Sequence, residues 1–300
     1  MKDFISIADF TGEQLAGLLD RAAAEKKRFK AGDLPPTCQR KTLAMIFEKP
    51  SLRTRVSFQC AITQLGGAAI YLTDQDIGLG KRESVADVGR VLGGMCDAVA
   101  VRTFDQAHVT CLGEHCAAPV INALTDRAHP CQAMADIMTA REVFGDLAGR
   151  TIAFVGDGNN VARSLAVLCA KLGIAFVLAC PAGYELDADQ AAGGLVQVRD
   201  PHQAVRDAAV VYTDTWVSMG QQDQRARRVE AFSPFQVNEA LMASAPADAV
   251  VMHCLPAYRG YEISDGVLAA HAETIFAQAE NRLHFQRALL NVLIAAGGIE

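Results

Sequence analysis

The sequence predicts an α/β fold with two doubly wound domains, each built on a mainly parallel sheet. Short apolar runs alternate with longer helical patterns along the chain, which is typical of parallel strands joined by crossover helices. The 300 residues, 51% of them hydrophobic, provide enough material for two packed cores. Polar residues follow several of the apolar runs, and ligands of such sheets bind at the carboxyl ends of the strands. We therefore expect an active site in the cleft between the domains.

The predicted elements start with a helix near Thr11, because Thr11 and Gln14 form a capping-box pattern. A second helix is expected over 56–65. An amphipathic run over 131–143 ends at Gly145 and leads into a second series of strands. The strand candidates, all of them short apolar runs, are 42–47, 68–72, 98–102, 119–122, 151–155, 175–179, 195–199, 210–213, 249–253 and 274–276.

The composition argues against several classes of protein. The formal net charge of −6 disfavours nucleic-acid binding, so any anion must be held by a local basic cluster. No run approaches the roughly 20 apolar residues of a membrane span, and the first residues lack a signal-peptide pattern, so we expect a cytoplasmic protein. Nine cysteines without a C-x-x-C pair favour reduced thiols, and Cys111, His115 and Cys116 form an incomplete metal shell.

The segment 51–55, Ser-Leu-Arg-Thr-Arg, indicates an anion site. It follows the strand at 42–47 and opens the helix at 56–65, so hydroxyls, guanidiniums and backbone N–H groups meet at one helix N-terminus. The helix dipole favours negative charge there, and the arginine fork fits phosphate oxygens. In the alternative interpretation, Ser51 only caps the helix and the two arginines are solvated.

The loop 156–161, Gly-Asp-Gly-Asn-Asn-Val, has part of a dinucleotide-binding motif. The third glycine of that motif falls on Val161, so its spacing is incomplete. The loop is either a tight strand-to-helix turn or a segment whose asparagine contacts a substrate. This loop is the only feature that would support the alternative function of a nicotinamide-dependent oxidoreductase.

Five motifs resemble the signatures of the ornithine carbamoyltransferases, within the aspartate/ornithine carbamoyltransferase superfamily. They occur in the order found in that family and cover nearly the whole chain. The motifs are Phe47–Arg55 (FEKPSLRTR), His129–Gln132 (HPCQ), Asp214–Gly220 (DTWVSMG), His253–Pro256 (HCLP) and Glu280–Arg282 (ENR).

The resemblance implies a carbamoyl phosphate-binding domain over 1–130 that is rejoined by a C-terminal helix at 279–300. A linking helix at 131–149 and an ornithine-binding domain over 150–278 would complete the chain. The implied reaction transfers the carbamoyl group of carbamoyl phosphate to the δ-amine of L-ornithine, giving L-citrulline and phosphate. A homotrimer with active sites at subunit interfaces is expected, with no metal ion, organic cofactor, nucleic acid or membrane. Related amines, N-acetylornithine or putrescine, are the alternative substrates.

The resemblance also implies a carbamoyl phosphate site. Arg102 and His129, together with Thr54, would polarise the carbonyl oxygen, where charge develops in the tetrahedral intermediate. Gln132 and the backbone carbonyl of Leu255 suit the carbamoyl NH₂. The full set of implied contacts is Ser51, Leu52 (through its amide), Arg53, Thr54, Arg102, His129, Gln132, Leu255 and Arg282.

The implied ornithine contacts are Asn160, Asp214, Ser218 and Met219. An alkyl amine with a lysine-like pKa of about 10.4 must lose a proton before it attacks. Asp214 and Cys254 would lie beside it, to align the amine and to relay the proton. A nucleophilic Cys254 is the competing interpretation. Closure of the loop at 218–220 would exclude water. The expected catalytic residues are Arg53, Arg102, His129, Asp214 and Cys254.

Two features bear on how far the resemblance extends. The loop at 73–83 often carries a glutamine that reaches into the neighbouring subunit's site, and this chain has Gly78 at that position. The residue that completes the adjacent site is therefore open. A family member retained only for binding would be expected to lack Arg53, His129 or Cys254, and this chain has all three.

Overall fold

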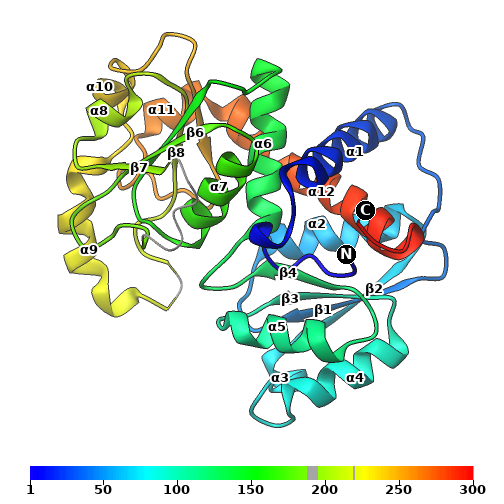
Figure 1. The fold of residues 1–300 in the computed structure, drawn as a ribbon. Helices are drawn as coiled ribbons and strands as arrows, with labels where there is room; N and C mark the ends of the chain where they lie inside the picture. The colour runs from blue at the N-terminus through cyan, green and yellow to red at the C-terminus, as the bar shows by residue number, and fades with distance from the viewer. Residues whose placement is uncertain (188–194, 219, 300) are drawn as a thin grey trace. The chain divides into compact units, whose positions relative to one another are not determined.

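The computed structural model describes residues 1–187, 195–218 and 220–299, and it divides the chain into two compact units (Figure 1). Unit 1 comprises Met1–Met138 and Glu280–Glu300, and unit 2 comprises Thr139–Ala279. Each unit contains its own parallel sheet with helices packed on it, as the alternating pattern predicted.

The sheet of unit 1 has four parallel strands in the order β2-β1-β3-β4. From β1 the chain runs outward to β2 and then crosses to β3 on the other side of β1. The carboxyl ends of β1 and β3 are therefore neighbours, with Phe47 beside Arg102, at the point where the strand order reverses. The strands are β1 (Thr42–Phe47), β2 (Ala68–Thr73), β3 (Ala98–Arg102) and β4 (Val120–Leu124).

Helices cover both faces of this sheet. In Figure 1, α4 and α5 lie on one side of it and α1, α2 and α12 on the other. The strands β1 and β3 are accordingly buried almost throughout, as expected for a parallel sheet covered on both faces. The helices of unit 1 are η1 (Ile7–Asp9), α1 (Gly12–Lys30), α2 (Leu52–Gln64), α3 (Asp74–Ile77), α4 (Val85–Met95), α5 (Gln106–His115) and the π-helical η5 (Asn291–Ala295).

Two long helices cross from one unit to the other along the chain. Helix α6 (Pro130–Phe144) leaves unit 1 after Met138, and α12 (Ala272–Leu290) enters it at Glu280.

Capping explains where the first helices begin. The capping box predicted for α1 is confirmed, because Thr11 Oγ1 accepts from the Gln14 amide at 3.2 Å and the Gln14 side chain accepts from the Thr11 amide at 3.0 Å. Helix α2 starts at Leu52, four residues earlier than expected. Ser51 takes an extended conformation and its Oγ accepts from the Thr54 amide at 3.3 Å, so the whole basic segment belongs to the first turn.

The sheet of unit 2 has five parallel strands in the order β7-β6-β5-β8-β9. The order reverses between β5 and β8, so the loops that follow these two strands meet. The strands are β5 (Thr151–Val155), β6 (Ala175–Ala179), β7 (Leu195–Val198), β8 (Ala208–Thr213) and β9 (Val250–His253).

The helices of unit 2 pack around a core that includes Trp216 and Phe232, whose rings stack at a centroid distance of 6.1 Å. They are α7 (Asn160–Lys171), α8 (Pro201–Val205), η3 (Gln222–Gln224), α9 (Arg225–Phe232), η4 (Ser233–Phe235), α10 (Glu239–Met242) and α11 (Asp265–Ala270).

One strand prediction is wrong. Residues 274–276 belong to the first turns of α12, where Ile275 is buried in the core of unit 2 and Phe276 is exposed. The β-branched and aromatic residues of this short run suggested a strand, but the buried positions continue at helical spacing through Gln278 and Asn281. Among the described residues, no helix has both the length and the apolar character needed to cross a bilayer.

Candidate active site

Thr54 is the centre of a polar cluster at the N-terminus of α2. Its hydroxyl oxygen lies 3.1 Å from Ser51 Oγ, 3.0 Å from an Arg282 nitrogen and 3.5 Å from an Arg102 nitrogen. A hydroxyl has two acceptor lone pairs and one hydrogen. The two guanidiniums, which can only donate, therefore occupy both acceptor positions of this hydroxyl and hold it in place beside Ser51.

The cluster continues through Arg282 to Gln132. A second nitrogen of Arg282 donates to Gln132 Oε1 at 2.6 Å, and Gln132 Nε2 donates to Asp136 Oδ1 at 2.8 Å. Arg102, Gln132 and Arg282 are all buried. Two buried guanidiniums at a helix N-terminus with no acidic residue in its first turn make a strongly electropositive site.

His129 lies in the field of these arginines. Burial lowers the pKa of His129 well below its usual value, and the charges of Arg282, Arg102 and Arg53 act in the same direction. The imidazole is therefore neutral at pH 7, and a neutral ring can donate one hydrogen bond to a carbonyl oxygen.

Arg53 is half-buried in the first turn of α2, whereas the Leu52 side chain is 75% exposed. The apolar side chain of Leu52 points to solvent, so Leu52 can contact a bound phosphate only through its backbone amide. Hydrogen bonds connect five of the predicted residues: Ser51, Thr54, Arg102, Gln132 and Arg282. Electrostatic interactions connect Arg53 and His129 to this group.

Contacts that the sequence did not predict hold the loops of this cluster in place. The Glu48 amide donates to the Arg102 carbonyl at 2.9 Å, and the Thr103 hydroxyl donates to the Glu48 carboxylate. Lys49 is 3% exposed, pairs with Asp126 and lies 4.0 Å from the centroid of the Phe104 ring. These residues connect the carboxyl ends of β1, β3 and β4. The sequence did not predict these contacts, because the partners lie in three separate segments of the chain.

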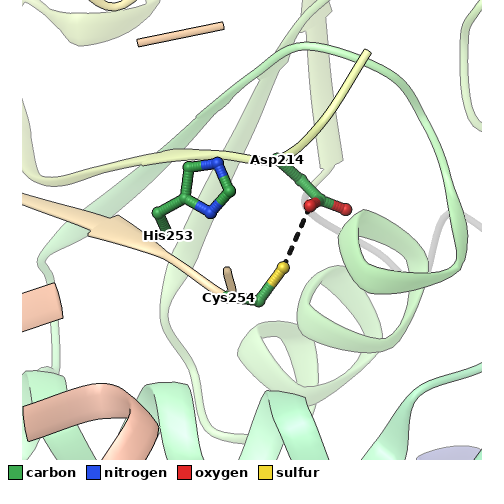
Figure 2. Close-up of side chains that lie close together, drawn as sticks. All are labelled: Asp214, His253 and Cys254. Carbon is green, nitrogen blue, oxygen red and sulfur yellow. Dashed lines mark hydrogen bonds between the residues drawn. The ribbon is translucent and has the colours of Figure 1, made fainter. Parts of the chain in front are cut away.

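In unit 2 the carboxylate of Asp214, at the end of β8, accepts three hydrogen bonds. Cys254 Sγ donates to Oδ1 at 3.0 Å (Figure 2), the Thr215 amide donates to the same oxygen at 2.8 Å, and Asn159 Nδ2 donates to Oδ2 at 2.8 Å. A carboxylate offers about four acceptor positions. Within the described part of the chain, one position therefore remains for a cationic or amine ligand.

His253 supports the neighbouring loop instead of facing Asp214. Its Nδ1 accepts from the Leu255 amide at 2.8 Å, so its Nε2 carries the hydrogen and donates to Glu262 Oε1 at 3.2 Å. The first of these contacts holds Leu255 at a φ of 57°, in the left-handed region that a leucine rarely adopts. Such strained residues cluster at functional sites.

Asp214, His253 and Cys254 lie close enough together to suggest a metal site, with ligand atoms within 4.8 Å of one another. Both ring nitrogens of His253 are engaged, however, by Leu255 and Glu262. That leaves two ligands, fewer than the three that a catalytic zinc ion takes from a protein.

The glycine-rich loop after β5 is a tight turn with a polar end. A Cβ on Gly158 would lie 2.7 Å from backbone atoms of Tyr184 and Glu185, so glycine is needed for the close approach of two chain segments. Asn159 caps α7 and also donates to Asp214, a role that the sequence analysis missed although an asparagine before a helix is a typical cap.

Asn160, the predicted ornithine contact, is the first residue of α7 and is half-buried. The backbone amide and carbonyl of Ser218 both bond with Gln221, at 3.1 Å each. Met219 lies outside the described residues. The structure therefore brings Asp214 and Cys254 together and adds Asn159, whereas the backbone groups expected from Ser218 are engaged locally.

Comparison with known proteins covers both units. A family model described as "Aspartate/ornithine carbamoyltransferase, carbamoyl-P binding domain" matches residues 2–142, and one described as "Aspartate/ornithine carbamoyltransferase, Asp/Orn binding domain" matches residues 148–293. The ornithine carbamoyltransferase of Anoxybacillus flavithermus is 45% identical over 98% of this chain and 96% of its own length.

Solved structures give the same result. The ornithine carbamoyltransferase from Pyrococcus furiosus has a TM-score of 0.92 at 44% identity and covers 99% of this chain and 97% of its own. The anabolic ornithine carbamoyltransferase from Campylobacter jejuni has a TM-score of 0.91 at 39% identity and covers 98% of this chain and 99% of its own. This chain belongs to the aspartate/ornithine carbamoyltransferase family.

Proposed function

We propose that this protein is an ornithine carbamoyltransferase, which converts carbamoyl phosphate and L-ornithine into L-citrulline and phosphate. The observation that carries the proposal is the convergence of Arg102 and Arg282 on the hydroxyl of Thr54 at the N-terminus of α2. This cluster suits a small dianion with a carbonyl group. Each charged hydrogen bond contributes about 1.5–3 kcal/mol, so several together overcome the unfavourable net charge of −6.

The carbamoyl phosphate-binding residues of the proposal keep the predicted roles. Ser51, Arg53 and Thr54 hold the phosphate with the amide of Leu52, and Arg102 reaches both the phosphate and the carbonyl oxygen. His129 is neutral and donates to that carbonyl, where negative charge develops. The carbamoyl NH₂ is held by Gln132, whose Oε1 accepts a second hydrogen bond beside that from Arg282, and by the carbonyl of Leu255.

The amine side of the reaction uses the remaining acceptor position of Asp214. The δ-ammonium donates to this carboxylate and loses one proton through Cys254 to water, and after the attack the nitrogen gives a second proton to the departing phosphate. The amine nitrogen attacks the carbonyl carbon, a tetrahedral intermediate forms, and the bond from carbon to the phosphate oxygen breaks. Asn160, with backbone groups of Ser218 and Met219, orients the α-carboxylate and α-amine. For the Ser218 groups, this requires release of their contacts with Gln221.

The proposal includes the domain roles and the assembly. A carbamoyl phosphate-binding domain over 1–130 with 279–300, a linker over 131–149 and an ornithine-binding domain over 150–278 would act in a homotrimer. Two exposed apolar side chains of unit 1, Val56 on α2 and Ile70 on the edge strand β2, suit contact with a second copy of the chain. A cytoplasmic location is consistent with nine free cysteines.

A citrulline assay tests the proposed function. Purified protein is supplied with carbamoyl phosphate and, separately, with L-ornithine, N-acetylornithine, putrescine and L-lysine. Carbamoyl transfer is measured as the ureido product of each amine, and we expect efficient transfer to L-ornithine only. Turnover confined to another amine, or no turnover at all, would contradict the proposal. In the Asp214→Asn variant, the ornithine KM should rise more than the carbamoyl phosphate KM, because only the amine contacts this carboxylate.

A further inference from the structure

Arg228 is a buried arginine on helix α9. It is 4% exposed, and its guanidinium lies 4.8 Å from the centroid of the Tyr184 ring and 5.4 Å from that of Phe232. Its Nε donates to the backbone carbonyl of Trp216, and its Nη2 donates to the carboxylate of Asp157. A guanidinium is the side chain that can make both contacts at once, because its donors form a planar fork.

The two partners of Arg228 belong to the two loops of the amino-acid site. Asp157 is in the loop after β5, two residues before Asn159 and three before Asn160. Trp216 follows Asp214 by two residues and precedes Ser218 by two. The guanidinium therefore connects the loop that carries the asparagines to the loop that carries the carboxylate. The hydrogen bond from Asn159 to Asp214 is a second side-chain link between these loops.

We propose that Arg228, held by Asp157, is a positioning residue for the amino-acid substrate. It fixes the backbone of Trp216 and, through it, the distance between Asp214 and the Ser218 segment. The inference rests on the proposed function, because it assigns the same site an additional determinant of ornithine binding. Arg228 itself does not touch the substrate in this proposal.

A purely structural role makes a different prediction. A buried ion pair contributes little net stability, because replacing both partners with apolar or neutral residues often leaves the protein as stable as before. If Arg228 served the fold alone, the double variant Arg228→Met/Asp157→Asn would recover both stability and activity. If it positions the loop, the double variant would recover stability while the contact with the Trp216 carbonyl stays lost.

The experiment measures ornithine KM, carbamoyl phosphate KM and the thermal midpoint for the wild type, Arg228→Met and the double variant. We expect the ornithine KM to rise about tenfold or more in both variants, as for the loss of a charged hydrogen bond. The carbamoyl phosphate KM should stay within about twofold of the wild-type value, because no charged hydrogen bond to that substrate is lost. The thermal midpoint should fall in Arg228→Met and return towards that of the wild type in the double variant.

Arg227→Met is the matched control, because Arg227 is an exposed neighbour on the same helix. It should leave both KM values unchanged. An unchanged ornithine KM in the double variant would overturn the positioning role, as would an equal rise of both KM values or a similar change in Arg227→Met. A wild type that forms no citrulline would instead contradict the proposed function on which the role rests.

Discussion

Arg53, Arg102 and Arg282 oppose protonation of His129, and the same three charges would neutralise a bound dianion. The same few arginines thus supply both the positive charge and the hydrogen-bond donors of the proposed site. Because the donors are fixed by burial and by each other, they need little rearrangement when negative charge develops. The activity of the site should therefore be very sensitive to the removal of one guanidinium.

Arg53→Ala is expected to lower kcat by about 10²–10³, as for the loss of one donor from an oxyanion-type site. Arg53 is half-buried at the start of a helix, so the fold should be retained. Citrulline formation and far-UV circular dichroism measure the two effects. Arg90→Ala, which removes an exposed arginine on α4, is the control. A rate near that of the wild type in Arg53→Ala would show that the phosphate lies elsewhere.

Asp157 gives the protein a stability that depends on pH. Burial raises the pKa of Asp157 to about 6, although Arg228 acts in the opposite direction. The native state therefore binds this proton more tightly than the unfolded chain, whose aspartate pKa is about 3.9. Its contribution to stability is fully present below that value and is lost as the pH rises through about 6.

Urea unfolding of the wild type and of Asp157→Asn between pH 4 and about 7 measures this contribution, because the asparagine does not titrate. The free energy of unfolding of the wild type, relative to the variant, should decrease with increasing pH across this range. A relative stability that increases with pH would mean that Arg228 outweighs burial and lowers the pKa.

At the scale of elements, α12 carries Arg282 into the proposed phosphate site and is held against α1 and α2 by charged and polar contacts. Arg287, fully buried, donates to Glu25 at 3.0 Å and to Gln64 at 2.9 Å. Lys26 donates to Asn281 at 2.8 Å, one residue before Arg282. The sequence could predict that the last helix belongs with the first domain only through the family resemblance, since these partners are more than 200 positions apart.

Arg287→Met should destabilise the protein by up to about 3–5 kcal/mol, because the buried carboxylate of Glu25 then keeps, among the described residues, only its 3.4 Å contact with Arg28. Thermal or urea unfolding measures the loss. Glu25→Gln/Arg287→Met removes both charges and should recover most of the stability. If the double variant is as unstable as the single one, packing of the arginine stem, and not its charge, holds the helices together.

At the scale of the whole molecule, the sequence predicted nine strands to within about two residues, because buried parallel strands are short apolar runs with distinct ends. It failed at 274–276, where three residues carry too little periodicity to separate a strand from the first turns of a helix. The residues proposed to carry the chemistry were predicted from motifs. Their supports, Asn159, Arg228 and Lys49, were not, because their partners come from distant segments and only the fold brings them together.

Assembly is the remaining property at this scale. The apolar side chains of Val56 and Ile70 are 48% and 47% exposed, and β2 is an edge strand of its sheet. Exposed edge strands and apolar patches mark contact surfaces. The proposed homotrimer predicts a mass close to three times 32.0 kDa for the wild type in light scattering. Val56→Glu should shift the protein towards single chains, because it places a charge in the proposed interface.

The control for this substitution is Val196→Glu, on the edge strand β7 of the other sheet, where the valine is 52% exposed. It adds the same charge to a similarly exposed position and should leave the mass unchanged. Single chains of Val56→Glu should also lose citrulline formation if a neighbouring copy completes each site. Single chains that keep full activity would show that one copy is sufficient, and an unchanged mass would place the interface on another surface.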